Sequence, residues 1–207
     1  MTEDELGSFR VLPRRFFQRS APAVAEDLLG RLLLHRDEEG LCGGLIVETE
    51  AYDQNDPASH SCHGRTERNQ MMFGHGGVAY VYRSYGVHWC FNVSVGRKGF
   101  GAAALIRAVK PLTGFTQMTK RRLQSLKNCR PQDLARGPGR LCQAMAIDHT
   151  HNGADLLEGP LFLASPLGFK RPASVATPRI GISKAVDIPW RFSIVDSEFV
   201  SGKRIRQ

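Results

Sequence analysis

The stretch Ile46-Val47-Glu48-Thr49-Glu50-Ala51-Tyr52 combines a strand pattern with two carboxylates and an aromatic ring. β-Branched residues favour an extended backbone, in which successive side chains alternate between two faces. The pattern predicts that Glu48, Glu50 and Tyr52 share one face, opposite to the residues at positions 47, 49 and 51. A carboxylate inside a protein must be hydrogen-bonded, paired or protonated. The two acids are therefore either a structural pair or part of a reactive site.

The length and composition around this stretch suit a globular protein with one core. The chain has 207 residues, of which 42% are hydrophobic and 23% are charged, and such a chain can form one sizeable core. We predict a single domain over residues 11–207, preceded by a disordered segment at residues 1–10.

The charge balance points to a polyanionic partner. The chain has 28 Lys and Arg against 20 Asp and Glu, a net charge of +8, and a basic excess of this kind favours binding to phosphates. No apolar run approaches the length of a membrane span, and the acidic N-terminus does not look like a signal peptide. We therefore expect a cytoplasmic protein without a membrane partner, associated with the nucleoid if its polyanionic partner is DNA.

The five cysteines are scattered, odd in number and without a Cys-x-x-Cys pair. This spacing supports neither a zinc site nor a disulfide framework, so we expect no metal and a reducing compartment.

Hydrophobic periodicity predicts an α+β fold. We expect a mixed antiparallel β core, a partly open barrel-like sheet, with flanking helices and a protruding β-hairpin. The hairpin joins 78–82 to 87–95, and the long polar segment 53–77 is predicted to be a functional loop. The other expected strands are 32–35, 45–52, 102–109, 161–163, 179–183 and 191–195, and the expected helices lie within 24–32, 111–136 and 141–147.

Several polar and aromatic residues could carry function. Tyr85 stands at the predicted hairpin tip, where it either meets a partner surface or folds back onto a strand. Arg107 lies on a strand that otherwise reads as buried, and it could pair with Glu48 or Glu50, as a structural ion pair or to keep an acid ionised. The aromatic residues with polar tips could form a slot for a flat ring or belong to the core; they are Tyr52, His60, Tyr80 and Tyr82.

A series of short motifs, in order from about residue 11 to residue 195, resembles the alkylpurine (3-methyladenine) DNA glycosylase family. The sequence departs from the family pattern at Glu67, where many relatives have Pro, and at Cys62 and His63. The matching motifs are Val47–Tyr52, Ser59–Ser61, Arg68-Asn69, Met72-Phe73, Tyr80–Tyr82, Tyr85-Gly86, Asn92-Val93, Leu105–Ala108 and Gly137–Ala144.

The resemblance implies a monofunctional glycosylase that needs no metal or cofactor and binds double-stranded DNA as a monomer. Such an enzyme flips a damaged purine out of the duplex and hydrolyses its N-glycosidic bond, which leaves an abasic site. The damaged purines of this class are 3-methyladenine, 7-methylguanine, hypoxanthine and ethenoadenine. Flipping costs a few kcal/mol, and least for a damaged base.

The resemblance also implies roles for individual residues. Glu50 would be the general base, and Arg107 and a backbone carbonyl near Ile182 would be further ligands of the attacking water. Asn92 would crowd the exocyclic amino group of an unmodified guanine, and Tyr85 would fill the gap in the base stack. The remaining implied positions are Tyr52, His60 and Tyr82 around the flipped base, and Met72 and Arg140 at the DNA.

Two other functions are compatible with the residues themselves. The first is a nucleic-acid-binding module without chemistry. The second is a metal-dependent phosphodiesterase in which Glu48 and Glu50 are ligands of Mg²⁺.

The basic face with which the expected glycosylase would bind DNA would include Arg83, Lys120, Arg121 and Arg140.

Overall fold

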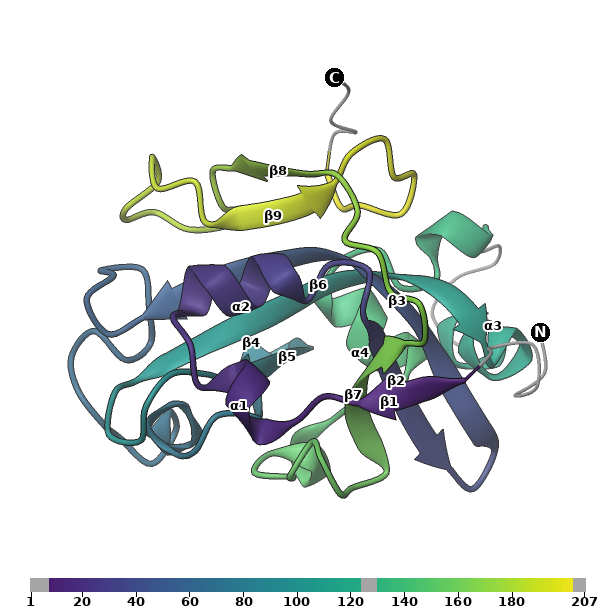
Figure 1. Cartoon of the computed structure of the whole chain (residues 1–207), viewed down its shortest axis with the longest axis horizontal. Coiled ribbons are helices and arrows are strands. Elements are labelled where there is room, and N and C mark those ends of the chain that lie inside the picture. The colour runs from purple at the N-terminus through teal and green to yellow at the C-terminus, as the bar shows by residue number, and fades with distance from the viewer. Residues whose placement is uncertain (1–7, 124–129, 203–207) are drawn as a thin grey trace.

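A computed structural model of the chain describes residues 8–123 and 130–202 (Figure 1). The expected disordered segment 1–10 lies mostly outside the described residues. Its described end is not disordered, because Phe9 and Arg10 belong to a strand that pairs with Ala164–Pro166. No helix among the described residues is long and apolar enough to cross a membrane.

The fold is α+β, as predicted, and its centre is one open antiparallel sheet. The strands follow the order β1-β7-β2-β3-β6-β5-β4, and a hairpin of β8 and β9 joins the sheet through β3. The strands are β1 Phe9–Val11, β2 Leu32–Asp37, β3 Gly40–Asp53, β4 Ala79–Ser84, β5 His88–Ser94, β6 Ala102–Thr113, β7 Leu161–Pro166, β8 Ser174–Thr177 and β9 Arg191–Ile194.

Within residues 8–123 and 130–202, four α-helices and three 3-10 turns surround the sheet. In Figure 1, α2 lies along the two long strands β3 and β6, and the β8–β9 hairpin lies above them. The helices are α1 Arg14–Phe17, α2 Ala21–Asp27, α3 Phe115–Leu123 and α4 Pro138–Ala144, and the 3-10 turns are Gln70–Phe73, Pro131–Asp133 and His149–His151.

The strand β3 holds the sheet together because it has neighbours along its whole length. Its first half pairs with β2, residues 48–50 pair with β9, and β6 runs along its other side from residue 43 to residue 53. The end of β3 that carries Glu50 is therefore a central strand, and its backbone is hydrogen-bonded on both sides.

The two faces of β5 and β6 have different surroundings, as the alternation of side chains along a strand predicts. Phe91, Val93, Ala104 and Ile106 pack in the main hydrophobic core, together with apolar residues of α2 and α4. The intervening side chains line a cavity on the opposite face; they are Cys90, Asn92, Ala103, Leu105 and Arg107. Alternation thus separates the core from the cavity.

The predicted alternation fails at one place. The pairing of β3 with β6 shifts register on both sides of Glu48, as a bulge would. Val47 consequently packs with Ala108 in a separate cluster, whereas Ile46 and Val109 lie in the main core. The prediction that the residues at 47, 49 and 51 form one set was therefore wrong for Val47.

Three other elements differ from the sequence prediction. The predicted strand at 179–183 does not form, because Gly181 has a φ of +78° and the backbone turns there. The strand in this region is β8, which ends at Thr177. The first long helix ends at Asp27, and Gly30, with a φ of +76°, leads the chain into β2. Helix α4 begins at Pro138, three residues earlier than expected.

Candidate active site

A cavity of about 760 Å³ opens over the face of the sheet formed by β3 to β6. Its floor consists of strand side chains, and two segments outside the sheet close it laterally, one around residues 57–63 and one at residues 180–184. Among the predicted site residues, eight line this cavity directly: Glu50, Tyr52, His60, Met72, Tyr82, Asn92, Arg107 and Ile182. Tyr85 also lines it from the hairpin tip, but Arg140 does not belong to the lining residues.

Glu50 is fully buried at the floor of the cavity. One carboxylate oxygen, Oε2, accepts hydrogen bonds from the Tyr52 hydroxyl at 2.8 Å and from Arg107 Nη1 at 3.1 Å. The other, Oε1, accepts one from the backbone N–H of Ile180 at 2.8 Å. All three partners are donors, which suits an acceptor-only carboxylate. The carboxylate is thus held rigidly with one side toward the cavity.

Glu48 is equally buried but has a closed environment. Its Oε1 accepts from Arg107 Nε at 3.0 Å, from Arg191 Nε at 2.7 Å and from the Ser201 hydroxyl at 2.9 Å. Its Oε2 accepts from the Ser201 backbone N–H at 2.6 Å. Protein donors surround the carboxylate, and Glu48 does not line the cavity.

Arg107 bridges the two acids, whereas the sequence left open which of them it would pair with. Burial alone would lower the pKa of its guanidinium, but Glu50 and Glu48 outweigh burial and raise it. A permanent cation therefore lies where a Mg²⁺ ion shared by the two carboxylates would have to be. This arrangement does not fit the phosphodiesterase alternative.

One wall of the cavity is a cluster of aromatic rings. The rings of His60 and Tyr82 meet edge to face with centroids 4.5 Å apart, and Tyr80 and Tyr82 lie 5.4 Å apart. Tyr52 adds a further ring, whose hydroxyl is held by Glu50. Burial and the nearby Glu50 raise the pKa of the Tyr52 hydroxyl above its ordinary value, so it remains protonated and donates.

The protonation of His60 follows from its neighbours. Its Nδ1 lies 2.9 Å from the Tyr80 hydroxyl. Burial, and then Arg68, lowers the pKa of His60, while burial raises the pKa of Tyr80 to about 12. His60 is therefore a neutral imidazole beside a protonated Tyr80 hydroxyl, and its tautomer determines which of the two groups donates in this hydrogen bond.

Other lining residues are fixed by the strands. Asn92 is buried, and its side-chain amide donates to the Tyr80 carbonyl at 3.0 Å. Cys90 lies on the same face of β5, and burial raises the pKa of its thiol, which keeps it neutral. Met72 packs with Tyr80 and Ala103 beneath the aromatic wall.

Tyr85 stands at the tip of the β4–β5 hairpin and is 91% exposed. The backbone N–H of Val87 donates to the Ser84 carbonyl at 3.0 Å and closes the turn. Tyr85 and Gly86 both have positive φ values, +49° and +69°. The alternative that Tyr85 folds back onto a strand is therefore wrong, and the ring projects into solvent.

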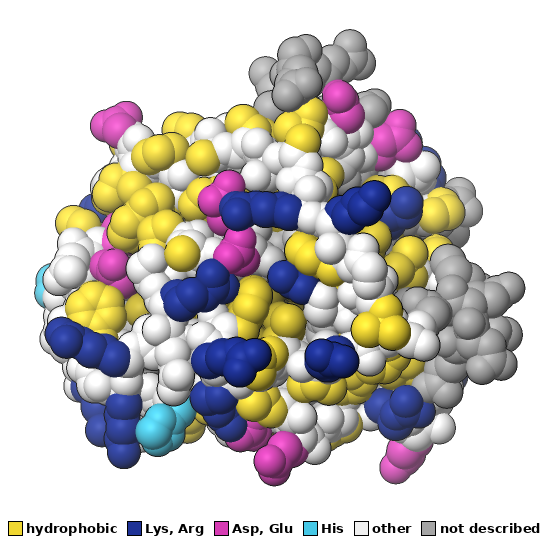
Figure 2. Space-filling view, viewed as in Figure 1, with side chains coloured by type: hydrophobic (Ala, Val, Ile, Leu, Met, Phe, Trp, Pro, Cys, Tyr) yellow, Lys and Arg dark blue, Asp and Glu magenta, His cyan; other side chains and the backbone are white. Residues whose placement is uncertain are grey.

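The expected basic face is only partly formed. Arg83 is exposed and lies 5.5 Å from the Trp89 ring centroid, and the Arg140 side chain is half exposed, 3.7 Å from Asp133. Arg121, in contrast, is largely buried and pairs with acids of the β2–β3 hairpin, so it does not suit a phosphate contact. Lysine and arginine side chains are spread over the face that carries α1 and α2 (Figure 2).

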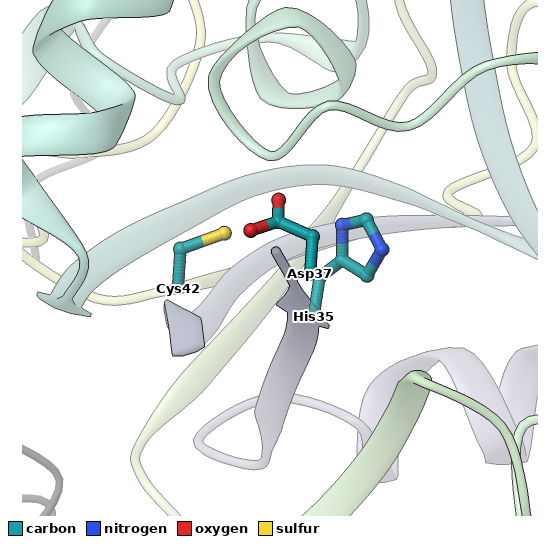
Figure 3. Close-up of side chains that lie close together, drawn as sticks. All are labelled: His35, Asp37 and Cys42. Atoms are coloured by element: carbon teal, nitrogen blue, oxygen red, sulfur yellow. The ribbon is translucent and has the colours of Figure 1, made fainter. Parts of the chain in front are cut away.

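A group of potential metal ligands lies outside the cavity. The ligand atoms of His35, Asp37 and Cys42 are within 4.8 Å of one another (Figure 3). Arg121 already donates to this group, with Nη2 at 2.6 Å from Asp37 and Nη1 at 3.5 Å from the Cys42 sulfur. Because a guanidinium fills the position between these two side chains, the group is an ion-pair cluster.

The sequence analysis missed several residues that hold the site. Arg191 and Ser201 enclose Glu48, and Arg179 forms a buried ion pair with Asp56 behind Tyr52. An arginine between Trp190 and Phe192 in a strand-like segment was a visible signal for Arg191. No local pattern indicates the pairing of Arg179 with Asp56, because 123 residues separate them.

Comparison with known proteins agrees with this geometry. The family model of methylpurine-DNA glycosylase (MPG) matches residues 15–198. A protein of Granulibacter bethesdensis is 49% identical over 195 residues, 93% of this chain and 88% of its own length. One of Methanoculleus marisnigri is 47% identical over 195 residues, covering 93% and 99% respectively. Both bear the name "Putative 3-methyladenine DNA glycosylase". The chain belongs to the methylpurine-DNA glycosylase family.

Proposed function

We propose that this protein is a monofunctional DNA glycosylase that removes alkylated or deaminated purines from double-stranded DNA. The observation that carries the proposal is the position of Glu50, a buried carboxylate at the floor of an aromatic-walled cavity. A cavity of about 760 Å³ has room for a single purine, since small-molecule pockets span roughly 300–1,000 Å³. The names of the relatives point to the same reaction.

In the proposed reaction, Glu50 is the general base. Water attacks C1′ of the deoxyribose while the bond from C1′ to the purine nitrogen breaks, and the bonding electrons leave with the purine. Glu50 takes the proton of the water, which requires a hydrogen bond of roughly 2.6–3.2 Å. The hydrogen bonds from Tyr52, Arg107 and the Ile180 amide keep the carboxylate in place. The backbone near Ile182, on the same cavity segment, would supply a further ligand for the water.

The base would be held by rings and by shape. Tyr52, His60 and Tyr82 would contact the flipped purine, and an alkylated purine carries positive charge that aromatic faces attract. In the tautomer whose Nδ1 accepts from Tyr80, the Nε2–H of neutral His60 would donate to an acceptor on the base. Asn92, fixed by the Tyr80 carbonyl, would exclude the amino group of unmodified guanine.

The DNA would meet the protein at the hairpin. Tyr85 is the exposed ring beside the cavity, and it would fill the space that the flipped base leaves in the stack. Met72 and Arg140 are further proposed contacts, and Arg83 would neutralise phosphate near the hairpin. We infer that one copy of the chain acts alone, since the proposed general base, the aromatic rings and the hairpin tip of one chain all border the same cavity.

Incubation with duplex DNA that carries one alkylated or ethenylated purine tests the proposal. We expect release of the free base, insensitive to EDTA, and an abasic strand that breaks only after alkali or heat. Strand cleavage that EDTA abolishes would instead support a phosphodiesterase, and strand breakage without alkali would contradict the monofunctional assignment. Binding to the lesion without base release would leave a nucleic-acid-binding module.

A further inference from the structure

A buried arginine behind the cavity contacts several of its parts. Arg179 and Asp56 form an ion pair in which both side chains are fully buried. Two guanidinium nitrogens face the two carboxylate oxygens, one of them Nη2 at 3.0 Å from Oδ1. Arg179 Nη1 also donates to the Ala51 carbonyl at 2.9 Å. The guanidinium carbon lies 4.6 Å from the centroid of the Tyr52 ring.

These contacts join three separate segments of the chain. Ala51 and Tyr52 belong to the end of β3 and directly follow Glu50. Asp56 begins the loop that carries His60, and its carboxylate accepts from the Ala58 backbone N–H at 3.0 Å. Arg179 directly precedes Ile180, whose N–H binds Glu50 at 2.8 Å. Each segment supplies lining residues of the cavity, while Arg179 itself is not one of them.

Stability alone does not account for this arrangement. Taking an arginine and an aspartate out of water costs several kcal/mol for each ion, so a buried ion pair is weak evidence for stabilisation. The pair does, however, impose geometry. A guanidinium is planar, binds a carboxylate through two parallel N–H groups and stacks on a ring through its face. The Asp56 carboxylate fixes the plane of Arg179, and the Arg179 face limits where the Tyr52 ring can lie.

We propose that Arg179 is a positioning residue for base excision. It holds the Tyr52 ring, the Tyr52 hydroxyl on Glu50 and the Ile180 amide on Glu50 in one arrangement, so the base slot and the proposed general base stay aligned. The inference rests on the proposed glycosylase function. Arg179 does not contact the purine or the attacking water in this proposal. It acts through Tyr52 and Ile180.

Two variants separate positioning from folding. Arg179→Lys keeps the buried positive charge but loses the planar fork. Arg179→Gln combined with Asp56→Asn removes both charges, so neither is left unpaired in the interior. The matched control is Arg121→Lys, which alters another largely buried guanidinium whose acidic partners, Asp37 and Glu39, do not line the cavity.

The measurements are single-turnover base release and equilibrium binding on the same lesion duplex, at a temperature where thermal melts show every variant folded. We expect release to fall about 10–100-fold in both Arg179 variants, since small misplacements of reacting groups cost on the order of 10²-fold. Affinity for the lesion duplex should change less than about threefold, because the exposed contacts of the hairpin are untouched. Arg121→Lys should release the base at the wild-type rate.

Two results would overturn the inference. Wild-type release rates in both Arg179 variants would show that the ion pair has no positioning role. Losses of binding and release by the same factor would show that Arg179 supports only the shape of the binding surface. Failure of the proposed function would look different from either result. In that case the wild-type protein itself would release no base from any lesion tested.

Discussion

The two carboxylates of β3 have the same chemistry and the same burial, yet they lie in opposite kinds of environment. Both are fully buried, and both bind Arg107. Glu48 is enclosed by Arg107, Arg191 and Ser201. Glu50 is held by Tyr52, Arg107 and Ile180, and it borders a cavity.

The difference teaches that burial alone does not identify a functional acid. The acid at the closed end links β3, β6 and β9 with the segment at Ser201, and this linkage suits a structural role. The acid at the open end is oriented by donors that leave it access to a substrate. Arg107 binds both carboxylates, so a substitution of either one will alter the hydrogen bonding of the other.

Glu50→Gln changes the carboxylate that borders the cavity and should have the largest effect on base release. The amide cannot accept a proton from water, and general-base catalysis contributes roughly 10²–10⁴-fold, so single-turnover base release should fall by that order. Lesion-duplex binding, measured by fluorescence anisotropy, should be retained. Normal turnover by this variant would remove Glu50 from the proposed reaction.

Glu48→Gln changes the carboxylate that is enclosed by protein donors and should lower the free energy of unfolding. Removing one partner of a buried ion pair leaves unpaired charge and costs about 3–5 kcal/mol. Here the unpaired charge is on Arg191, while Arg107 keeps its ion pair with Glu50. Urea denaturation should show this loss in the free energy of unfolding. If Glu48→Gln were as stable as the wild type but inactive, the assignment of the two ends would be reversed.

Tyr85→Ala sharpens the comparison by separating DNA binding from both carboxylates. The side chain is exposed at a hairpin tip, so thermal stability should not fall. Loss of the ring should weaken lesion-duplex binding by about 1–3 kcal/mol, as for base-stacking aromatics. An unchanged dissociation constant would mean that Tyr85 does not enter the base stack.

His35 makes the stability of the folded protein depend on pH. Burial, above all, lowers the pKa of His35, whose Nδ1 lies 2.7 Å from the Met145 carbonyl. The unfolded chain therefore binds a proton near pH 6.5 that the folded chain refuses, and stability falls as the pH drops below that value. The contribution of His35 is fully present above pH 6.5.

His35→Gln should reduce the difference in unfolding free energy between pH 7.5 and pH 5, the smallest of the four effects. Urea denaturation at several pH values measures it. If the stability of the variant varied with pH as steeply as that of the wild type, His35 would not be the source of the acid response.

The sequence predicted those parts of the fold that depend on local periodicity. The end of β3, the hairpin and the alternating faces of β5 follow directly from side chains that repeat every two residues. The roles expected for Glu50, Asn92 and Arg107 came from the family resemblance, and in the structure these three side chains share the face opposite to the core.

Other features depend on tertiary contacts that no local pattern encodes. The register shift inverts the alternation at Val47, because Val47 has no partner residue on β6. The segment at 179–183 has apolar residues typical of a strand, but the Ile180 N–H is bound to Glu50 rather than to a neighbouring strand. The enclosure of Glu48 by Ser201 joins residues 153 positions apart.

The backbone of Tyr85 has a consequence for the evolution of the hairpin. A φ of +49° is uncommon for a residue with a large side chain, and Gly or Asn would adopt it at lower cost. The turn is therefore less stable with tyrosine than it would be with the residues that such turns favour. Selection for thermal stability alone would replace the ring, so hairpin stability and the stacking role proposed for Tyr85 would compete at this one position.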